Sequence, residues 1–348
     1  MTFETILHKE IYQQPETIRN LIRSASEPVL QLARAIQSAK IDYVLLAARG
    51  TSDNAGIYAK YVLGAKNGLP VSLATPSLYS VYKQPPRLGN ALVLGISQSG
   101  RSPDIVSVLA EARRQGAMTA VITNAPDSLL AKEGDFVIDL LAGEELAVAA
   151  TKTYTAELAA IALLSALLAD GDESMAALEQ IPDAIATTLE INSVIAEVAP
   201  RYRYMNRCVV IGRGFNYATA FEMALKMKEL TYSVVQPYSS ADFLHGPRAL
   251  IEPGFPVVVI APRGKLDLEM RSFVQELKTQ SAEIIAISDV PEILDLSTIQ
   301  LALPRSVPEW LSPLITIIPG QLLSLHLAQT RGYDVDSPRS LSKITETH

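Results

Sequence analysis

The sequence of 348 residues contains a single cysteine, Cys208, and only four histidines. One cysteine cannot form an intrachain disulfide, and it excludes metal sites that need several thiolates. Neither a helical His-Glu-x-x-His pattern nor a tight Asp/His cluster occurs. We therefore expect no metal, no redox cofactor and a reducing, cytoplasmic setting.

Long apolar runs and an excess of positive charge are also absent. Residues 158–169 are too few to span a membrane, and the uncharged stretch 311–329 is interrupted by Pro319-Gly320 and His326, so both are predicted to be buried helices. No apolar signal core follows the first residues. The net charge of −7 argues against a nucleic-acid partner. The expectation is a soluble protein with neither membrane nor nucleic acid as a partner.

Apolar β-branched runs alternate with longer helical patterns in both halves of the chain. Predicted strands lie at Tyr43–Ala47, Ala91–Gly95, Thr119–Thr123, Cys208–Ile211, Pro256–Ile260 and Glu283–Ile287. Amphipathic segments around 55–64 and 103–114 separate the first three. Strand, helix and strand at this spacing predict βαβ units, and therefore an α/β fold with parallel sheets.

The two halves share landmarks at one offset. Arg49-Gly50 and Arg213-Gly214 both follow a predicted strand, and Gly100 and Gly264 follow the next one, each pair 164 residues apart. This agreement predicts an internal duplication. The predicted organisation is an N-terminal helical arm at 1–30, a first domain at 31–175, a helical linker at 176–200, a second domain at 201–332 and a C-terminal tail at 333–348.

The strongest single motif is Ser97-Gln98-Ser99-Gly100-Arg101-Ser102, which stands between a buried strand and a helix. Ligands of open parallel sheets bind at the carboxyl ends of strands, and a helix N-terminus there favours phosphate. Ordinary N-capping explains one serine but not three. The motif predicts a phosphate site, to which Thr51 and Ser52 of the preceding turn add hydroxyl groups.

The duplicated half differs at this point. The counterpart of Ser97-Gln98-Ser99 is Ala261-Pro262-Arg263, which has no hydroxyl group and one amide N–H fewer, so phosphate is expected on the first domain only.

Gly212-Arg213-Gly214 has the form of a dinucleotide-binding turn. The next predicted strand, near 233–236, ends without an acidic residue to hold a ribose, and we expect no nicotinamide cofactor.

Two features of the second half are candidates for acid–base chemistry. Glu222, Lys226 and Glu229 are spaced to lie on one helix face, although a solvated face with modest ion pairs has the same pattern. His245 stands in a predicted loop, Ala241 to Pro247, where it could act as an acid or base or simply be a surface residue.

Several motifs in order are similar to those of the sugar isomerase (SIS) family in its double-domain form, over nearly the whole chain. The matching stretches are 11–15, Arg49-Gly50-Thr51-Ser52, Ser97-Gln98-Ser99-Gly100, Glu145–Lys152, Glu222–Glu229, Leu244-His245-Gly246-Pro247 and Asp334–Arg339. Within the family the chain resembles most the isomerase half of glutamine–fructose-6-phosphate aminotransferase. The resemblance implies two tandem flavodoxin-like domains with helices on both faces of each sheet, an N-terminal arm and a functional tail.

The resemblance also implies roles for individual residues. The predicted phosphate and sugar contacts are Thr51, Ser52, Ser97, Gln98, Ser99 and Ser102, with Val148 and Ala150 lining the sugar pocket through their backbone. Glu229 matches the base that moves a proton between C1 and C2, and His245 matches a ring-opening histidine that reaches into the neighbouring subunit's site. Lys343 matches a lysine that forms a Schiff base with the ketose. Glu222 and Lys226 match the supporting polar face of the catalytic helix.

Departures from the family pattern favour a particular branch. The chain starts where the isomerase half would start, so we expect no glutaminase domain and no use of glutamine as ammonia donor. The phosphate loop reads Ser-Gly-Arg-Ser instead of Ser-Gly-Glu-Thr, Ala149-Ala150 replaces Ala-Ser, and Asp242 replaces a glutamate. These changes resemble those of stand-alone amino-sugar-phosphate deaminases.

The implied activity is conversion of glucosamine 6-phosphate to fructose 6-phosphate and ammonia, or the reverse, by a homodimer with shared active sites. The alternatives are an isomerase or deglycase of another phosphosugar, a glutaminase-less protein similar to the aminotransferase, and a non-catalytic regulator that binds sugar phosphate.

Overall fold

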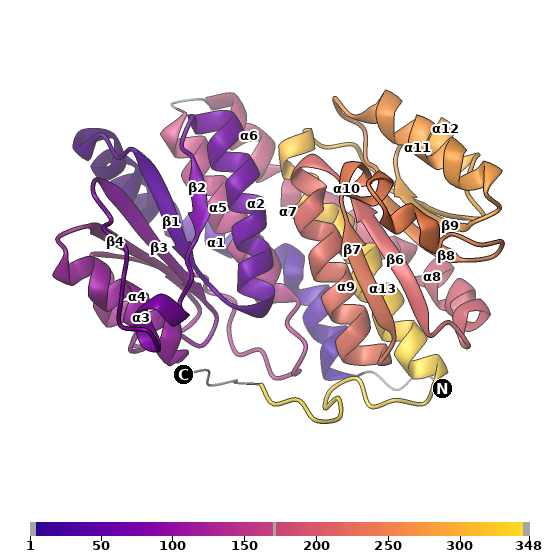
Figure 1. Ribbon diagram of the computed structural model, residues 1–348, viewed down its shortest axis with the longest axis horizontal. Coiled ribbons are helices and arrows are strands. Elements are labelled where there is room, and N and C mark those ends of the chain that lie inside the picture. Colours follow the sequence, from indigo (N-terminus) through magenta and orange to yellow (C-terminus); the bar gives the residue numbers. More distant parts are fainter. Residues whose placement is uncertain (1–4, 170–171, 344–348) are drawn as a thin grey trace. The chain divides into compact units, whose positions relative to one another are not determined.

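The computed structural model describes residues 5–169 and 172–343 (Figure 1). These residues form two compact units, which we name after their sheets. The N-sheet unit contains 16–145, 152–169, 172–180 and 342–343, and the C-sheet unit contains 5–15, 146–151 and 181–341. Each unit therefore includes segments from distant parts of the chain. Residues 344–348 of the predicted tail and 1–4 of the predicted arm lie outside the described residues.

The N-sheet unit is built on five parallel strands in the order β2-β1-β3-β4-β5. The strands are β1 (Tyr43–Ala47), β2 (Val71–Leu73), β3 (Ala91–Ser97), β4 (Met118–Thr123) and β5 (Phe136–Asp139). Its helices are α2 (Gly50–Asn67), α3 (Ser77–Ser80), α4 (Pro103–Arg114), α5 (Lys152–Leu168) and α6 (Asp172–Glu179). All seven residues of β3 are buried, as expected for a central strand covered by helices on both faces.

The C-sheet unit repeats this topology with the order β10-β9-β8-β6-β7. Its strands are β6 (Arg207–Gly212), β7 (Val234–Tyr238), β8 (Pro256–Ile260), β9 (Glu283–Ser288) and β10 (Ile299–Ala302). The first turns also match, because Arg49 and Arg213 are both extended and Gly50 and Gly214 have φ of +55° and +60°. Both sheets thus have one topology, as the duplication predicts, and its flavodoxin-like order is the one that the family resemblance implies.

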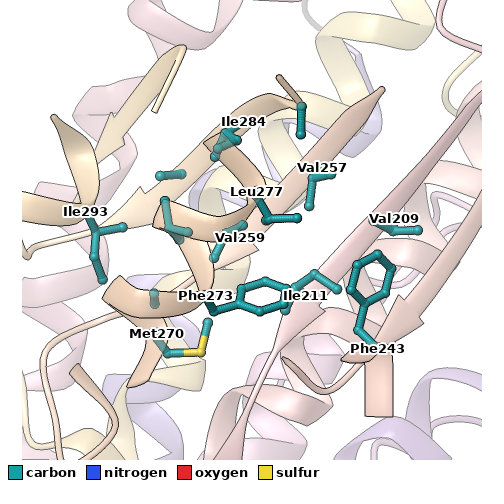
Figure 2. Close-up of a cluster of buried hydrophobic side chains, with 14 of the residues drawn as sticks. Val209, Ile211, Phe243, Val257, Val259, Met270, Phe273, Leu277, Ile284 and Ile293 are labelled. Atoms are coloured by element: carbon teal, nitrogen blue, oxygen red, sulfur yellow. The ribbon is translucent and has the colours of Figure 1, made fainter. Parts of the chain in front are cut away.

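Helices cover both faces of the second sheet (Figure 1). The remaining elements of this unit are α7 (Ile181–Thr188), α8 (Asn192–Val198), α9 (Tyr217–Thr231), α10 (Ser240–Leu244), α11 (Asp267–Thr279), α12 (Pro291–Leu294) and α13 (Pro313–Thr330). Figure 2 shows one core cluster, in which Met270 and Phe273 of α11 pack on Val259 and Ile211 of the sheet, with Phe243 of α10 beside them. α9 and α13 pack against each other.

Among the described residues, one helical segment, Glu309–Thr330, is long and apolar enough to cross a membrane, and 94% of its most apolar window is buried. Such burial is typical of a core helix, as predicted for residues 311–329. The helix continues through Pro319.

Two other helical regions differ from expectation. The arm is one helix, α1 (Ile6–Ala39), which extends beyond residue 30, and the linker is a series of short helices rather than one.

Candidate functional site

The serine-rich loop connects β3 to α4 in the N-sheet unit. Ser97 is the last residue of β3, and its hydroxyl accepts a hydrogen bond from the amide of Gly100 at 3.1 Å. Gly100 has φ of +60°, a left-handed conformation that glycine adopts without steric penalty. The loop therefore turns sharply and presents its remaining donors beside the first turn of α4.

Several of these donors are available to a ligand. The side-chain Nε2 of Gln98 is buried and has no hydrogen-bond partner among the described residues. Ser102 occupies the N-cap position of α4, but its side chain makes no capping bond, so ordinary capping does not account for it. Ser99 accepts only a long bond, 3.4 Å, from the amide of Arg101. An unpartnered buried donor at a helix N-terminus suits an anionic or polyhydroxy ligand.

The preceding turn is tied into the unit by buried carboxylates. Ser52 donates its hydroxyl to Glu157 at 2.7 Å, and Arg49 donates to Asp104 at 2.7 Å. Glu157 and Asp104 are almost completely buried. Ser52 is thus less available to a ligand than the resemblance implies, while Thr51 is buried beside it. The charge of Arg49 is matched by Asp104.

The equivalent loop of the C-sheet unit is closed by acidic side chains. The amides of Arg263, Gly264 and Lys265 donate to carboxylate oxygens of Asp289, Asp267 and Glu309, at 2.6, 2.5 and 2.9 Å respectively. Carboxylates already occupy the position that a phosphate would need, and their charge would repel it. This arrangement supports the prediction that phosphate binds on the first domain only.

Substitution of Gly100 is expected to damage the loop. An alanine Cβ at position 100 would lie 2.0 Å from Ser128 Oγ and 2.5 Å from Ser128 Cβ, in addition to the left-handed penalty of about 1–2 kcal/mol. We expect Gly100→Ala to lower the free energy of unfolding in urea by about 1–3 kcal/mol more than Gly116→Ala. Gly116 is the matched control, because it has φ of +77° and open space around it. Equal effects of the two substitutions would contradict the crowding.

The polar face of α9 forms a buried ion-paired row in the C-sheet unit. Lys226 Nζ lies 3.4 Å from Glu222 and 2.7 Å from Glu229. The side chains of Glu222 and Lys226 are 0% and 1% exposed, whereas that of Glu229 is 21% exposed. The alternative of a solvated helix face is therefore wrong, since solvent reaches only Glu229. The row presents one carboxylate to a ligand and holds it with a buried ammonium group.

His245 lies in a turn, and the short helix α10 takes up the first part of the loop predicted at Ala241 to Pro247. Ser239 caps α10 by accepting a bond from the amide of Asp242 at 3.0 Å, and Asp242 also receives the hydroxyl of Ser239. The amide of His245 donates to the carbonyl of Asp242 at 3.1 Å. His245 is exposed, so its imidazole is accessible to a second molecule.

The backbone segment with Val148 and Ala150 belongs to the C-sheet unit and is held by two carboxylates. Glu10 of α1 accepts the amides of Leu146 and Ala147 at 2.5 and 3.2 Å. Val148 donates its amide to the carbonyl of Asp336, whose carboxylate in turn caps the first turn of α1. The amide of Val148 is thus already engaged, so its carbonyl is the group of this residue that could contact a sugar.

Lys343 lies in the N-sheet unit, where its Nζ is 2.8 Å from Glu145 Oε2. Glu145 is buried and also accepts the amide and hydroxyl of Thr153 at 3.1 and 2.7 Å.

The carboxylates Glu10, Asp336 and Glu145 were not predicted as site residues. Glu145 and Asp336 stand within motifs shared with the SIS family and Glu10 directly precedes one, but the roles of all three depend on contacts between distant segments. Among residues 5–169 and 172–343, no group of three His, Cys, Asp or Glu side chains could hold a metal ion.

The model of the SIS domain matches this chain twice, at residues 37–167 and 202–331. The chain is 35% identical over 347 residues to glutamine–fructose-6-phosphate aminotransferase of Pyrococcus horikoshii. The matched region covers 98% of this chain but 57% of the relative. The chain thus spans somewhat more than half the length of this relative.

Two solved structures are similar along almost their full length. A candidate phosphosugar isomerase from Silicibacter pomeroyi has a TM-score of 0.87 at 33% identity, covering 95% of this chain and 100% of that one. The C-terminal domain of glucosamine-fructose-6-phosphate aminotransferase from Francisella tularensis has a TM-score of 0.86 at 30% identity, covering 97% and 99%.

Proposed function

Because the chain belongs to the SIS family, with two such domains, we propose that it is an enzyme that converts glucosamine 6-phosphate to fructose 6-phosphate and ammonia, or catalyses the reverse reaction. The observation that carries this proposal is the α9 row, in which the buried Lys226 holds the partly exposed carboxylate of Glu229 at 2.7 Å. A carboxylate held in this way is suited to moving a proton between adjacent carbons.

The serine-rich loop would bind the 6-phosphate, which is a part of the substrate that does not react. Gln98, Ser99 and Ser102 offer donors to the 6-phosphate, and the N-terminus of α4 favours its charge. Anchoring of the phosphate fixes the position of C1 and C2 and reduces the entropy lost on reaching the transition state. Val148 would contribute its carbonyl to a sugar hydroxyl.

The proton transfer would begin from the open-chain amino aldose, with His245 assisting the opening of the ring. Glu229 takes the proton from C2, which the C1 carbonyl acidifies, and the C1 oxygen takes a proton from solvent to give an enolamine. Return of the proton from Glu229 to C1 gives the protonated ketimine at C2, whose nitrogen returns one proton to solvent. Water adds to the ketimine, the C–N bond breaks, and ammonia and fructose 6-phosphate are released. Lys343 would act on the ketose carbonyl in the reverse direction.

The proposed activity is tested with a panel of amino-sugar 6-phosphates in a coupled assay for ammonia. We expect ammonia and fructose 6-phosphate in equal amounts from glucosamine 6-phosphate, because hydrolysis of one ketimine releases both. The unphosphorylated amino sugar is the control, and it should react far more slowly without its anchor. If the protein isomerises a phosphosugar without releasing ammonia, the proposed deamination is contradicted and the alternative of an isomerase is supported.

The proposal includes a homodimer in which His245 of one chain serves the sugar held by the other. Each of the variants His245→Ala and Glu229→Gln should be inactive alone. Mixing them under conditions of subunit exchange should restore up to about half of the wild-type activity per heterodimer, because both defects can fall in one site and leave the other intact. Mixing that restores no activity, or a fully active monomer, would reject shared sites.

A further inference from the structure

A second polar hollow lies in the C-sheet unit, at the amino ends of β6 and β7. Its volume is about 370 Å³, compared with about 30 Å³ for one water molecule in the liquid. Ten residues line it: Arg203, Tyr204, Met205, Asn206, Thr231, Tyr232, Ser233, Arg331, Tyr333 and Arg339. None of the candidate site residues described above is among them, and none of the ten is acidic.

The three arginines are the unusual feature of this hollow. Two nearby arginines of the same unit do pair with carboxylates, at Arg201–Glu283 and Arg207–Glu252. Arg203, Arg331 and Arg339 form no ion pair with a carboxylate among the described residues. Three like charges gathered on a protein of net charge −7 repel one another and favour any anion that can lie among them.

Arg331 forms the floor of the hollow and is fixed in place. Its guanidinium donates to the carbonyls of Thr231 and Arg203, at 2.7 and 3.0 Å, and to the carbonyl of Met205. Burial lowers the pKa of Arg331, and the groups that oppose this shift are Tyr333 and Cys208 rather than a carboxylate. Arg331 is therefore a partly buried charge without a carboxylate partner among the described residues, and its positive charge favours a nearby anion.

Arg203 and Arg339 are exposed, and their side chains leave donors for a ligand. The guanidinium of Arg339 lies 3.9 Å from the centre of the Tyr232 ring, and that ring packs on Tyr333 with centroids 4.8 Å apart. Stacking orients a guanidinium without using its N–H groups. Neither arginine side chain makes a hydrogen bond within the part of the chain that the structure describes. Tyr204, 89% exposed, adds an aromatic surface at the rim.

We infer that this hollow is a second anion-binding site, which takes a compact phosphorylated small molecule. Arg203 and Arg339 would bind the phosphoryl oxygens through charge-assisted hydrogen bonds, and Arg331 would supply a fixed charge beneath them. The hydroxyl of Tyr204 and the side-chain amide of Asn206, both on exposed residues, suit the polar remainder of the ligand. The site is independent of the proposed sugar-phosphate chemistry, because no residue is shared between them.

Inorganic pyrophosphate is the probe for this site, with binding measured by isothermal titration calorimetry. We expect Arg203→Gln to weaken one binding event by about 10-fold, as for loss of a charge-assisted hydrogen bond, and Arg203→Glu to abolish it by repulsion. Arg203→Lys keeps the charge and should weaken binding less than Arg203→Gln. Because Arg203 is exposed and its side chain makes no hydrogen bond, these variants should unfold at the wild-type temperature.

Two controls separate this site from the serine-rich loop. Arg87→Gln removes an exposed arginine of the N-sheet unit and should leave pyrophosphate binding unchanged. Ser99→Ala should leave the Arg203-dependent event unchanged, whatever it does to binding at the loop. The inference is overturned if Arg203→Glu binds pyrophosphate as the wild type does, or if no Arg203-dependent binding occurs up to about 10 mM. A crystal structure with pyrophosphate should place the anion between Arg203 and Arg339.

Discussion

Replacement of Glu229 by glutamine is expected to lower kcat for ammonia release by about 10²- to 10⁴-fold, as for loss of a general base. Glutamine keeps the shape of the side chain and can still accept a hydrogen bond from Lys226, which lies 2.7 Å away, but it cannot take a proton from carbon. Because the phosphate anchor is unchanged, KM should change much less than kcat.

The control for this variant is Glu276→Gln on α11. It makes the same chemical change at a carboxylate that is 54% exposed and only loosely paired with Arg248, at 3.9 Å. Glu276→Gln should retain the wild-type rate, and both variants should have near wild-type unfolding temperatures. Turnover of Glu229→Gln at the wild-type rate would remove Glu229 from the mechanism.

Replacement of Lys226 by methionine should lower the free energy of unfolding by about 3–5 kcal/mol, the usual effect of removing one partner of a buried ion pair. Methionine fills most of the space of the lysine side chain, so a cavity is not the main cause. The carboxylate of Glu222 is 0% exposed. In the variant it would stay buried but would lose the attraction of the Lys226 ammonium group. Urea denaturation of the purified variant measures the change.

Lys228→Met is the matched control, because Lys228 is an exposed residue of the same helix. Its substitution should change the free energy of unfolding by less than about 0.5 kcal/mol. Adding Glu222→Gln to Lys226→Met should restore part of the lost stability, since the buried negative charge is then removed. If Lys226→Met is as stable as Lys228→Met, the buried row does not stabilise the fold.

Local sequence predicted the central strands of both sheets and the helix that follows the serine-rich loop. Tyr43–Ala47 and Pro256–Ile260 were predicted with the bounds that β1 and β8 have, and Pro103–Arg114 with those of α4. A central parallel strand is buried on both faces, so it appears as a continuous apolar run that needs no other part of the chain to be identified. The common offset of the two halves likewise predicted one topology for both sheets.

The spacing of residues within one motif was enough to predict part of the candidate site. The carboxylates that distant segments contribute to the site could not be predicted in this way. The spacing of Glu222, Lys226 and Glu229 places them on one helix face, but only packing against other elements buries the first two. The roles of Glu10 and Glu145 could not be predicted, because each contacts a segment more than a hundred residues away in the sequence, at Leu146 and Lys343 respectively.

The sequence by itself determined the central strands of both sheets, the duplicated topology and the chemistry available at the end of β3, because hydrophobic period and turn chemistry are local properties. It did not indicate the short strands β2, β5 and β10. Only the tertiary structure decided which loops are open. Asp267, Asp289 and Glu309 close the second loop from separate elements, and the three arginines of the second hollow come from residues 203, 331 and 339. Such groups meet only when the chain is folded, since burial and charge pairing depend on long-range contacts that no local pattern contains.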